Sequence, residues 1–431
     1  MAEISMIEWT GSSRSFTRTA TLSARSSSFS LRRNADRFSE ARWRIGQAFV
    51  PEGFPGSVTP DYVPFQVWDT LQGLSTYIRC MLSTQALLSA IGVGEKKATV
   101  LGATFQWFLR DFTGMLGGIL FTFFQGSKLD ANAKTWRLAA DFMNDLGMLM
   151  DLISPIFPSA FVVIVCLGSI SRSFTGVASG ATRAALTQHF SLENNAADIS
   201  AKEGSQETVA TMVGMVLGML LAHATIGHPV AIWFSFLTLT MFHLYANYKA
   251  VCSLSLTTLN DERSSILLKY FMETGQVLSP QQVSVMEHVI PSWICLWKSK
   301  TAELPCRKIH LGVRVSTLKH SEMLELARSP SSRHGKAKYL LLEQNGIICV
   351  IIHKDSTAAD VLQSYIHALV VAHLLSIGRH AQAESNLWVD KNYSIFMSKL
   401  QASGWNTERL LAPAVVYRAS WECNPTTEKS S

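Results

Sequence analysis

A run of 41 residues, 208–248, contains no Asp, Glu, Lys or Arg, and it restricts the fold more than any other feature of this chain. A membrane-spanning helix needs about 20 predominantly apolar residues, so the run is long enough for two. Gly227, His228 and Pro229 lie near its middle, where Gly and Pro are typical of a turn. The sequence therefore predicts two antiparallel apolar helices in an integral membrane protein.

Composition and charge agree with membrane attachment. Charged residues make up 16% of the 431 residues, whereas about 25% is usual for a soluble domain. The net charge of +6 is modest, and no block of basic residues predicts a nucleic-acid partner. The seven cysteines include no CxxC pair, which indicates reduced thiols in a protein facing the cytosol or stroma.

Changes in composition predict five parts along the chain. Residues 1–46 form a variable, basic, Ser/Arg-rich segment, and the acid-free stretch 11–35 is typical of an organelle transit peptide. A disordered basic tail and an edge strand packed on another domain are the alternatives. The other parts are a helical core at 47–290, a linker at 291–305, an α+β domain at 306–420 and a tail at 421–431. The compartment stays open between a plastid and another endomembrane.

Hydrophobic periodicity predicts a mainly α fold, in which a helical membrane-associated bundle precedes a smaller α+β domain. The helices expected before the uncharged run are 61–92, 98–125, 133–153 and 156–170, and a polar region follows at 172–207. After that run the expected elements are a helix at 258–276, a helix from Ser279 with Pro280 in its first turn, a strand at 309–316, an Asn345-Gly346 hairpin, a helix from 355 capped by Asp355 or Ser356, and a helix at 390–401.

Arg110 and Asp111 interrupt the apolar segment 98–125 and are the first candidates for a functional site. Ionisable residues inside a membrane usually mark a functional path or a buried partner. A plain interhelical salt bridge, or a segment that does not span, would explain them equally well. Adjacent side chains on a helix diverge by about 100°, so each needs its own partner. The partners expected are Arg137 or Arg183 for Asp111, and Asp141 or Asp145 for Arg110.

Further candidates lie in two other helical segments. Asp141 and Asp145 share a helix face and would hold a cation or pair with Arg137 or Arg110, or else form a solvated face. Ser179, Thr182 and Arg183 lie in a small, hydroxylated segment whose backbone N–H groups would suit a phosphate. Tight helix packing is the alternative there, because three glycine pairs have GxxxG spacing. These are Gly114/Gly118, Gly176/Gly180 and Gly214/Gly218.

No motif predicts catalysis. The sequence contains no Walker-type loop, nucleophile elbow, HExxH motif or dinucleotide fingerprint. The histidines lack metal-ligand spacing, and His223 and His243, in apolar helices, are expected to be hydrogen-bonded polar residues. We therefore expect neither an enzyme nor a metal site.

Five long motifs carry a resemblance to a known family. They read FVPEGFPGSVTPDYVPFQVWDTLQGLSTYIRCMLSTQALL, GVGEKKATVLGATFQWFLRDFTGMLGGILF, WRLAADFMNDLGMLMDLISPIFPSAF, GVASGATRAALTQH and NNAADISAKEGSQETVATMVGMVLG. With them, the chain resembles the root UV-B sensitive family from about residue 49 to residue 291, and its C-terminal region resembles the plant members. The resemblance implies roles in UV-B response, root development and vitamin B6 homeostasis. It also implies a membrane location, in plastids for some members, and assembly with other family members.

Two functions from different classes follow. The first is a membrane protein that binds or transports a small anionic metabolite, such as pyridoxal phosphate or another B6 vitamer. Its expected ligand-binding residues are Arg110, Asp111, Asp141, Asp145, Ser179, Thr182 and Arg183. The second is a membrane-anchored adaptor whose C-terminal domain binds partner proteins. An enzyme is a third and weaker hypothesis.

Overall fold

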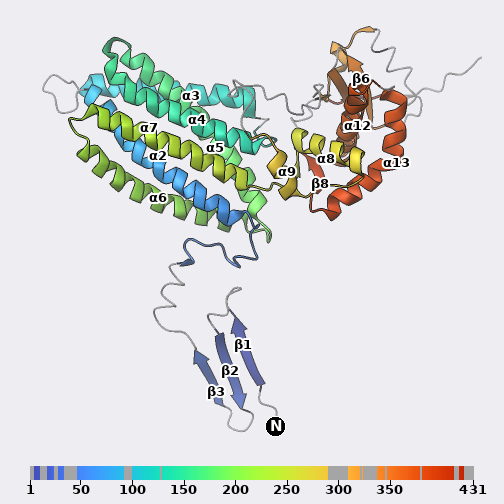
Figure 1. Cartoon of the computed structure of the whole chain (residues 1–431), viewed down its shortest axis with the longest axis horizontal. Helices are drawn as coiled ribbons and strands as arrows, with labels where there is room; N and C mark the ends of the chain where they lie inside the picture. Colours follow the sequence, from blue (N-terminus) through green and yellow to red (C-terminus); the bar gives the residue numbers. More distant parts are fainter. Residues whose placement is uncertain are drawn as a thin grey trace, which may run out of the picture. The chain divides into compact units, whose positions relative to one another are not determined.

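The structure is a computed structural model in which the chain forms two compact units (Figure 1). The first unit comprises Met1–Phe124 and Ala133–Leu254, and the second comprises Gln125–Asn132 and Ser255–Ser431. The residues that the structure describes are 4–9, 17–23, 28–33, 46–91, 100–126, 129–289, 309–320, 323, 337–344, 347–378, 381–411 and 417–421.

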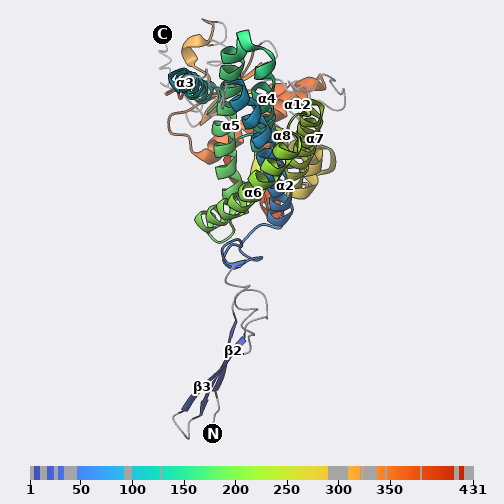
Figure 2. The same cartoon turned by 90° about the vertical axis from the view of Figure 1, so that its left-hand side faces the viewer.

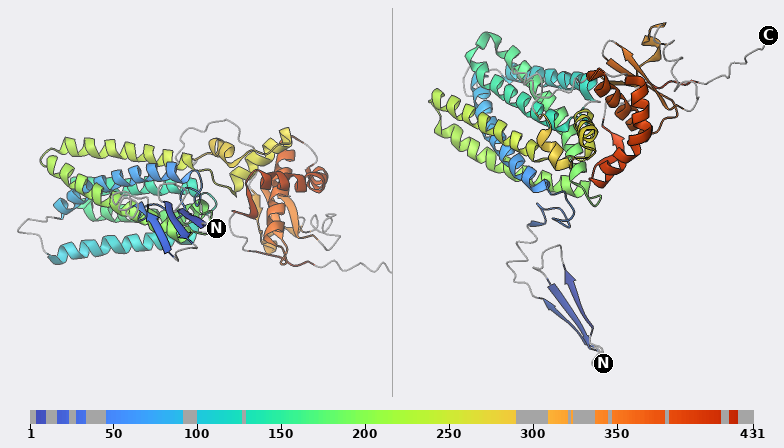
Figure 3. Two further views of the ribbon diagram at one scale, coloured as in Figure 1. Left: turned by 90° about the horizontal axis from the view of Figure 1, so that it is seen from below. Right: turned by 45° about the vertical axis from the view of Figure 1, so that its right-hand side comes forward.

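Long helices make up most of the first unit. They are α2 (Tyr62–Ala90), α3 (Val100–Gln125), α4 (Ala133–Ile153), α5 (Phe161–Phe190), α6 (Ala196–Ala224) and α7 (Pro229–Ser253). Two short 3-10 turns, η2 (Ser154–Ile156) and η3 (Pro158–Ala160), connect α4 to α5. Helix α2 packs against α4, α6 and α7, while α4 packs mainly against α5. The helix bundle therefore forms around α2 and α4, as Figure 1 and the right-hand view of Figure 3 show.

The uncharged run forms the predicted pair of helices, α6 and α7. The chain turns between them at Gly227, whose φ of 79° suits glycine, and Pro229 takes the first helical position. Each of the two helices packs along α2, which therefore separates them over much of their length. The prediction of two antiparallel helices is confirmed, although α6 begins at Ala196, well before the uncharged run.

Helix α5 differs most from expectation. It continues from Phe161 to Phe190 and so includes much of the region 172–207 that was expected only to be polar. Gly114 and Gly117 of α3 approach α5 closely: a Cβ at these positions would lie 2.5 Å from Ser169 Oγ and 2.9 Å from Ser173 Oγ. In Figure 2, α3 is viewed nearly along its axis while α5 is seen from the side, so the two helices cross at an angle.

Within the described residues, four helices are long and apolar enough to cross a membrane: Pro158–Phe190, Ala196–Ala224, Pro229–Ser253 and Ala358–Ser376. In each of the first three helices, only 17–22% of the most apolar 18-residue stretch is buried. Large apolar side chains there point outwards, including Leu220 (60% exposed) and Phe234 (72% exposed). A surface of this kind suits lipid contact. Segment 98–125 forms the predicted helix α3 but is not among these four.

The N-terminal segment contains an antiparallel sheet in the order β1 (Ile4–Trp9), β2 (Thr17–Ser23) and β3 (Ser28–Arg33). These strands pair with one another, so the alternative of a disordered tail differs from the structure. The transit-peptide hypothesis stays a prediction.

The second unit is an α+β fold, as predicted. Its main sheet has the order β5 (Ile309–Leu311), β7 (Ile347–Ile352) and β6 (Tyr339–Gln344), and β6 and β7 form the expected hairpin around residues 345–346, which lie outside the described residues. The remaining elements are β4 (Thr258–Leu259), α8 (Asp261–Thr274), α9 (Pro280–Met286), η4 (Val315–Thr317), α12 (Ala358–Ser376), α13 (Ala381–Ala402) and β8 (Asn406–Leu410), with β4 parallel to β8.

Helix α12 forms the core of this unit. In its most apolar 18-residue stretch, 61% is buried. Ile366 belongs to the same hydrophobic cluster as Val350 and Phe396. Burial inside the unit therefore accounts for its apolar sequence. Its cap is Thr357, which forms a capping box with Asp360, so the expected cap at Asp355 or Ser356 is wrong by one or two residues.

The boundary between the units lies at Leu254/Ser255, and not at residue 290 as expected. Leu267 and Phe271 of α8 and Val283 of α9 belong to the same hydrophobic cluster as α12. The side chain of Trp405 donates a hydrogen bond from Nε1 to the carbonyl oxygen of Leu278 at 2.8 Å. Helices α8 and α9 are therefore part of the second unit, and the predicted domain 306–420 is too short.

Candidate functional site

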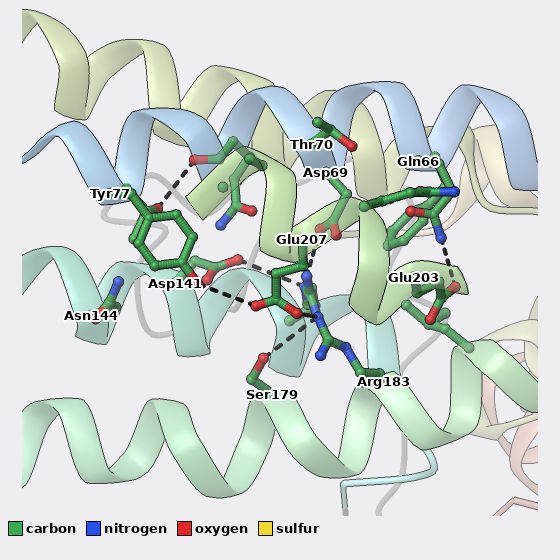
Figure 4. Close-up of a pocket in the computed structure, with 18 of the residues that line it drawn as sticks. Gln66, Asp69, Thr70, Tyr77, Asp141, Asn144, Ser179, Arg183, Glu203 and Glu207 are labelled. Carbon is green, nitrogen blue, oxygen red and sulfur yellow. Dashed lines mark hydrogen bonds and ion pairs between the residues drawn. The ribbon is translucent and has the colours of Figure 1, made fainter. Parts of the chain in front are cut away.

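A polar cavity of about 290 Å³ lies inside the first unit, between α2, α4, α5 and α6 (Figure 4). Its polar lining residues recur every three or four positions along each helix, a spacing that places them on one face. The lining comprises Phe65, Gln66, Asp69, Thr70, Gln72, Gly73, Thr76 and Tyr77 of α2, Arg137, Asp141 and Asn144 of α4, Thr175, Ser179, Arg183 and Leu186 of α5, and Glu203, Gln206, Glu207 and Ala210 of α6.

Arg137 is the central cation of the cavity. Its side chain is 7% exposed; Nη2 forms an ion pair with Asp69, and Nε lies 3.8 Å from Asp141 Oδ2. Nη1 donates a weak hydrogen bond to Ser179 Oγ at 3.5 Å. Arg137 Nε and Asp141 Oδ2 have no hydrogen-bond partner among the described residues, although both are buried. Buried polar atoms are normally satisfied, so these two indicate a place where a solute or water binds.

A second ion pair lies in the same cavity at its more exposed side. Arg183 Nη2 and Glu207 Oε2 are 2.7 Å apart, and the two side chains are 39% and 41% exposed. Figure 4 shows them turned towards each other between α2 and α5. The hydroxyl of Tyr77 donates to Glu207 Oε1 at 3.3 Å. Such a pair contributes little to stability but is open to exchange with a charged solute.

Glu203 provides a further buried acceptor. It is 8% exposed, and it accepts hydrogen bonds from Gln66 Nε2 at 2.6 Å and from Thr187 Oγ1 at 3.3 Å. With Asp69, Asp141 and Glu207, the lining has four carboxyl groups against two guanidinium groups. Burial raises the pKa of Asp141, which lies in α4 and outside the four apolar spans, and the nearby Arg137 opposes that rise. The lining therefore carries an excess of negative charge when its four carboxyl groups are ionised.

A buried ion-pair network borders the cavity. Asp145, one helical turn after Asp141, pairs with Arg79 Nη1 at 2.6 Å and with His243 Nδ1 at 2.9 Å. His243 Nε2 lies 2.8 Å from Gln72 Nε2, and Gln72 lines the cavity. The expectation that His243 is a hydrogen-bonded polar residue is confirmed, whereas Arg79 was not among the residues predicted for the site.

The structure divides the predicted site residues. Asp141, Ser179 and Arg183 line the cavity, and Asp145 belongs to the adjoining network. Thr182 does not line it, because its hydroxyl donates to the Ala178 carbonyl oxygen of its own helix at 2.8 Å. The backbone N–H groups of this segment lie within helix α5, so the predicted phosphate cradle is wrong.

Arg110 and Asp111 lie outside the cavity lining. Arg110 Nη2 is 3.9 Å from Asp151, which also pairs with Arg172, and the guanidinium carbon lies 4.5 Å from the centre of the Trp107 ring. A carboxylate partner for Arg110 was expected, but Asp141 and Asp145 are the wrong ones. Asp111 is exposed, so its predicted pairing with Arg137 or Arg183 is wrong.

The glycine pairs also divide. Gly214 and Gly218 of α6 pack on α2, where a Cβ would lie 2.7 Å from Tyr77 Cβ and 2.8 Å from Met81 Cγ respectively, so the predicted close packing is confirmed. Gly114 packs tightly on α5, but at Gly118 an added Cβ would meet only ordinary contacts at 3.8 Å. For Gly176 and Gly180, no described residue lies within 4 Å of an added Cβ, so their predicted packing role is wrong.

Four residues of the site have signals that could have been found in the sequence. Gln66, Asp69, Gly73 and Thr76 of α2 recur at helical spacing, which places three polar side chains and one glycine on a single face of the helix. Contact between α4 and α5 depends on Gly147, where an added Cβ would lie 2.8 Å from the carbonyl oxygen of Gly168. The partners across the cavity, in contrast, are distant in sequence, and no local pattern assigns them.

Two family models match the chain. The model described as the vitamin B6 photo-protection and homoeostasis domain covers residues 36–275, and the model described as the C-terminal region of root UVB sensitive protein covers residues 276–387. The first of these models includes every residue of the cavity lining. No solved structure matches the chain.

Curated relatives agree with the family models. The chain is 64% identical to protein root UVB sensitive 3 of Arabidopsis thaliana over 97% of its own length and 95% of that protein's. It is 42% identical to RUS family member 1 of Dictyostelium discoideum over 57% of this chain and 47% of the relative. It is 26% identical to protein root UVB sensitive 2, chloroplastic, of Arabidopsis thaliana over 84% of this chain and 82% of that protein.

Proposed function

The chain belongs to the root UVB sensitive family, and we propose that it binds a small polar solute in the cavity between α2, α4, α5 and α6 and carries it across a membrane. The observation that carries the proposal is a pair of buried polar atoms on the cavity wall, Arg137 Nε and Asp141 Oδ2, which lie 3.8 Å apart and have no hydrogen-bond partner among the described residues. A volume of about 290 Å³ suits a small metabolite, because ligand pockets start at roughly 300 Å³.

The charge of the lining narrows the solute class. With four carboxyl groups against two guanidinium groups, each of which already has a carboxylate partner, a phosphate ester would meet net repulsion. A cation or a zwitterion would instead offer an ammonium or pyridinium N–H to these carboxylates. The description of the matching family model names vitamin B6. An unphosphorylated B6 vitamer such as pyridoxamine or pyridoxine is therefore the preferred candidate. This proposal replaces the anionic metabolite expected from sequence.

Ligand-induced thermal stabilisation of the detergent-purified protein tests the binding step. A ligand at 100 times its Kd stabilises the folded state by about 2.7 kcal/mol, and we expect pyridoxamine to do so more strongly than pyridoxal phosphate. Asn144→Leu should abolish the effect, because Asn144 lines the cavity and the larger apolar side chain fills it without breaking any ion pair described above. Arg110→Gln, outside the lining, is the control that should keep it.

The outcomes separate the two functions inferred from sequence. Stabilisation by pyridoxal phosphate alone would support the anionic ligand and refute the charge argument. If no vitamer stabilises the protein at millimolar concentration, the cavity proposal is wrong, and an adaptor role for the second unit becomes the better hypothesis. Assembly with other family members and a plastid or other endomembrane location remain proposals.

A further inference from the structure

His243 lies at the centre of a buried network that the proposed binding step does not use. It is fully buried in α7, between Asp145 of α4 and Gln72 of α2. Asp145 in turn pairs with Arg79, which is 0% exposed and also donates to Thr240 Oγ1 at 3.2 Å. Chains of Asp and His inside helical membrane proteins often relay protons.

The charged groups that face His243 come from both helices packed against α7 at this point. They are Arg79 from α2, Asp145 from α4, and Asp141, one turn before Asp145, whose carboxylate interacts electrostatically with the imidazole. Arg79 and Asp145 balance each other when the imidazole is neutral. Uptake of a proton therefore adds a net positive charge directly behind the Asp141 wall of the cavity.

The hydrogen-bond directions couple this charge to Gln72. A carboxylate can only accept, so His243 Nδ1 carries a proton and donates it to Asp145. The other ring nitrogen, Nε2, then accepts from the Gln72 amide NH₂ at 2.8 Å. If Nε2 takes up a proton, two donors face each other, and the amide must turn to present its oxygen to the ring. Because Gln72 lines the cavity, the solute then meets an amide donor in place of an acceptor.

We propose that His243 is a proton-binding site coupled to the cavity through Gln72, so that solute binding and transport depend on protonation of this histidine. The step adds one proton from solvent to Nε2 and breaks no covalent bond. The positive charge and the turned amide both disfavour a cationic solute, so protonation should promote its release. The inference rests on the proposed function only in taking the cavity as the solute site.

Imidazole ¹⁵N NMR of the detergent-purified full chain tests proton binding without any ligand. We expect one histidine resonance that is absent in His243→Gln and that shows proton uptake at Nε2 as the pH is lowered within the range in which the protein stays folded. Gln72→Glu leaves the Arg79–Asp145 pair in place and puts a carboxylate against Nε2, so it should shift that titration to higher pH. This second variant keeps the test decisive if His243→Gln does not fold. A resonance that responds to these variants but stays neutral throughout would overturn the proposal.

Pyridoxamine binding tests the coupling. His223, an exposed histidine of α6, supplies the control variant His223→Gln. In the wild type and in this control, we expect the affinity for pyridoxamine to be at least about fivefold weaker at pH 5.5 than at pH 8. His243→Gln should reduce this ratio by at least about 2.5-fold relative to the wild type; the ligand's own ionisation is common to all variants and cancels in that comparison. An unchanged ratio in a folded His243→Gln would refute the coupling. Absence of binding at every pH would instead refute the proposed function, and the NMR result would still decide whether His243 binds a proton.

Discussion

Two Arg–carboxylate pairs of the first unit have nearly the same length but opposite burial, and this contrast gives the sharpest test of the packing described above. Arg79 and Asp145 are 2.6 Å apart and 0% and 6% exposed. Arg183 and Glu207 are 2.7 Å apart and 39% and 41% exposed. Two unit charges 4 Å apart attract by about 4 kcal/mol at an effective dielectric constant of 20 and by about 1 kcal/mol in water. Burial, and not distance, should therefore decide the coupling.

We expect Asp145→Asn to destabilise the protein by about 3–5 kcal/mol, because Arg79 is left buried without a counter-charge. Glu207→Gln should cost at most about 1 kcal/mol. In double-mutant cycles, Arg79→Met with Asp145→Asn should show a coupling of about 2–3 kcal/mol, and Arg183→Met with Glu207→Gln less than about 0.5 kcal/mol. Both are measured by equilibrium unfolding in mixed detergent micelles. Equal couplings in the two cycles would refute the burial argument.

Four further predictions concern other parts of the chain. Gly214→Ala should destabilise the bundle by about 1–3 kcal/mol, because its Cβ would meet Tyr77. Gly204→Ala on the same helix, with no described atom nearby, should instead stabilise it by up to about 1 kcal/mol. A loss of stability in both variants would refute the packing contact. A fragment of residues 255–431 should be soluble and unfold cooperatively, while 306–420, which lacks the α8 and α9 part of the core, should not; circular dichroism during urea titration decides this. Burial raises the pKa of Tyr393 to about 12. The stability of the fragment 255–431 should therefore fall as pH rises from about 10 to about 12, because the unfolded chain releases this proton first. Over that range the fragment with Tyr393→Phe should lose up to about 2 kcal/mol less stability than the unaltered fragment, and an equal loss would contradict the assignment. In a double-mutant cycle, Arg110→Gln with Asp151→Asn should show a coupling below about 1 kcal/mol, because the groups are 3.9 Å apart and Arg172 also holds Asp151; a coupling of 3 kcal/mol would contradict this.

Local patterns predicted many of the individual elements. Helix α4 has the expected bounds of Ala133–Ile153, and the Gly227–Pro229 break divides α6 from α7, because turn chemistry and apolar periodicity act over a few residues. The hairpin of β6 and β7 also follows from the Asn345-Gly346 pair. The length of helix α5 was underestimated, because Thr175, Ser179 and Arg183 make the second half of its sequence polar. These side chains face a polar cavity inside the bundle, which apolar periodicity does not detect.

The site could be predicted only in part, because its contacts join residues far apart in the chain. Asp141 and Arg183 were candidates from their own helices, but Glu207, the partner of Arg183 across the cavity, gave no local signal. Arg79 finds Asp145 across 66 positions of sequence. The most prominent pair in the sequence, Arg110-Asp111, lies outside the lining, since adjacent residues on a helix point to different environments.

Uptake of radiolabelled pyridoxamine into proteoliposomes tests the central claim most directly, because it requires both a membrane-spanning bundle and a solute site in the cavity. We expect saturable uptake by the wild type and by Arg110→Gln, and uptake at the level of empty vesicles for Asn144→Leu incorporated at equal density. Equal uptake by wild type and Asn144→Leu, or no uptake above empty vesicles by the wild type, would contradict transport through this cavity.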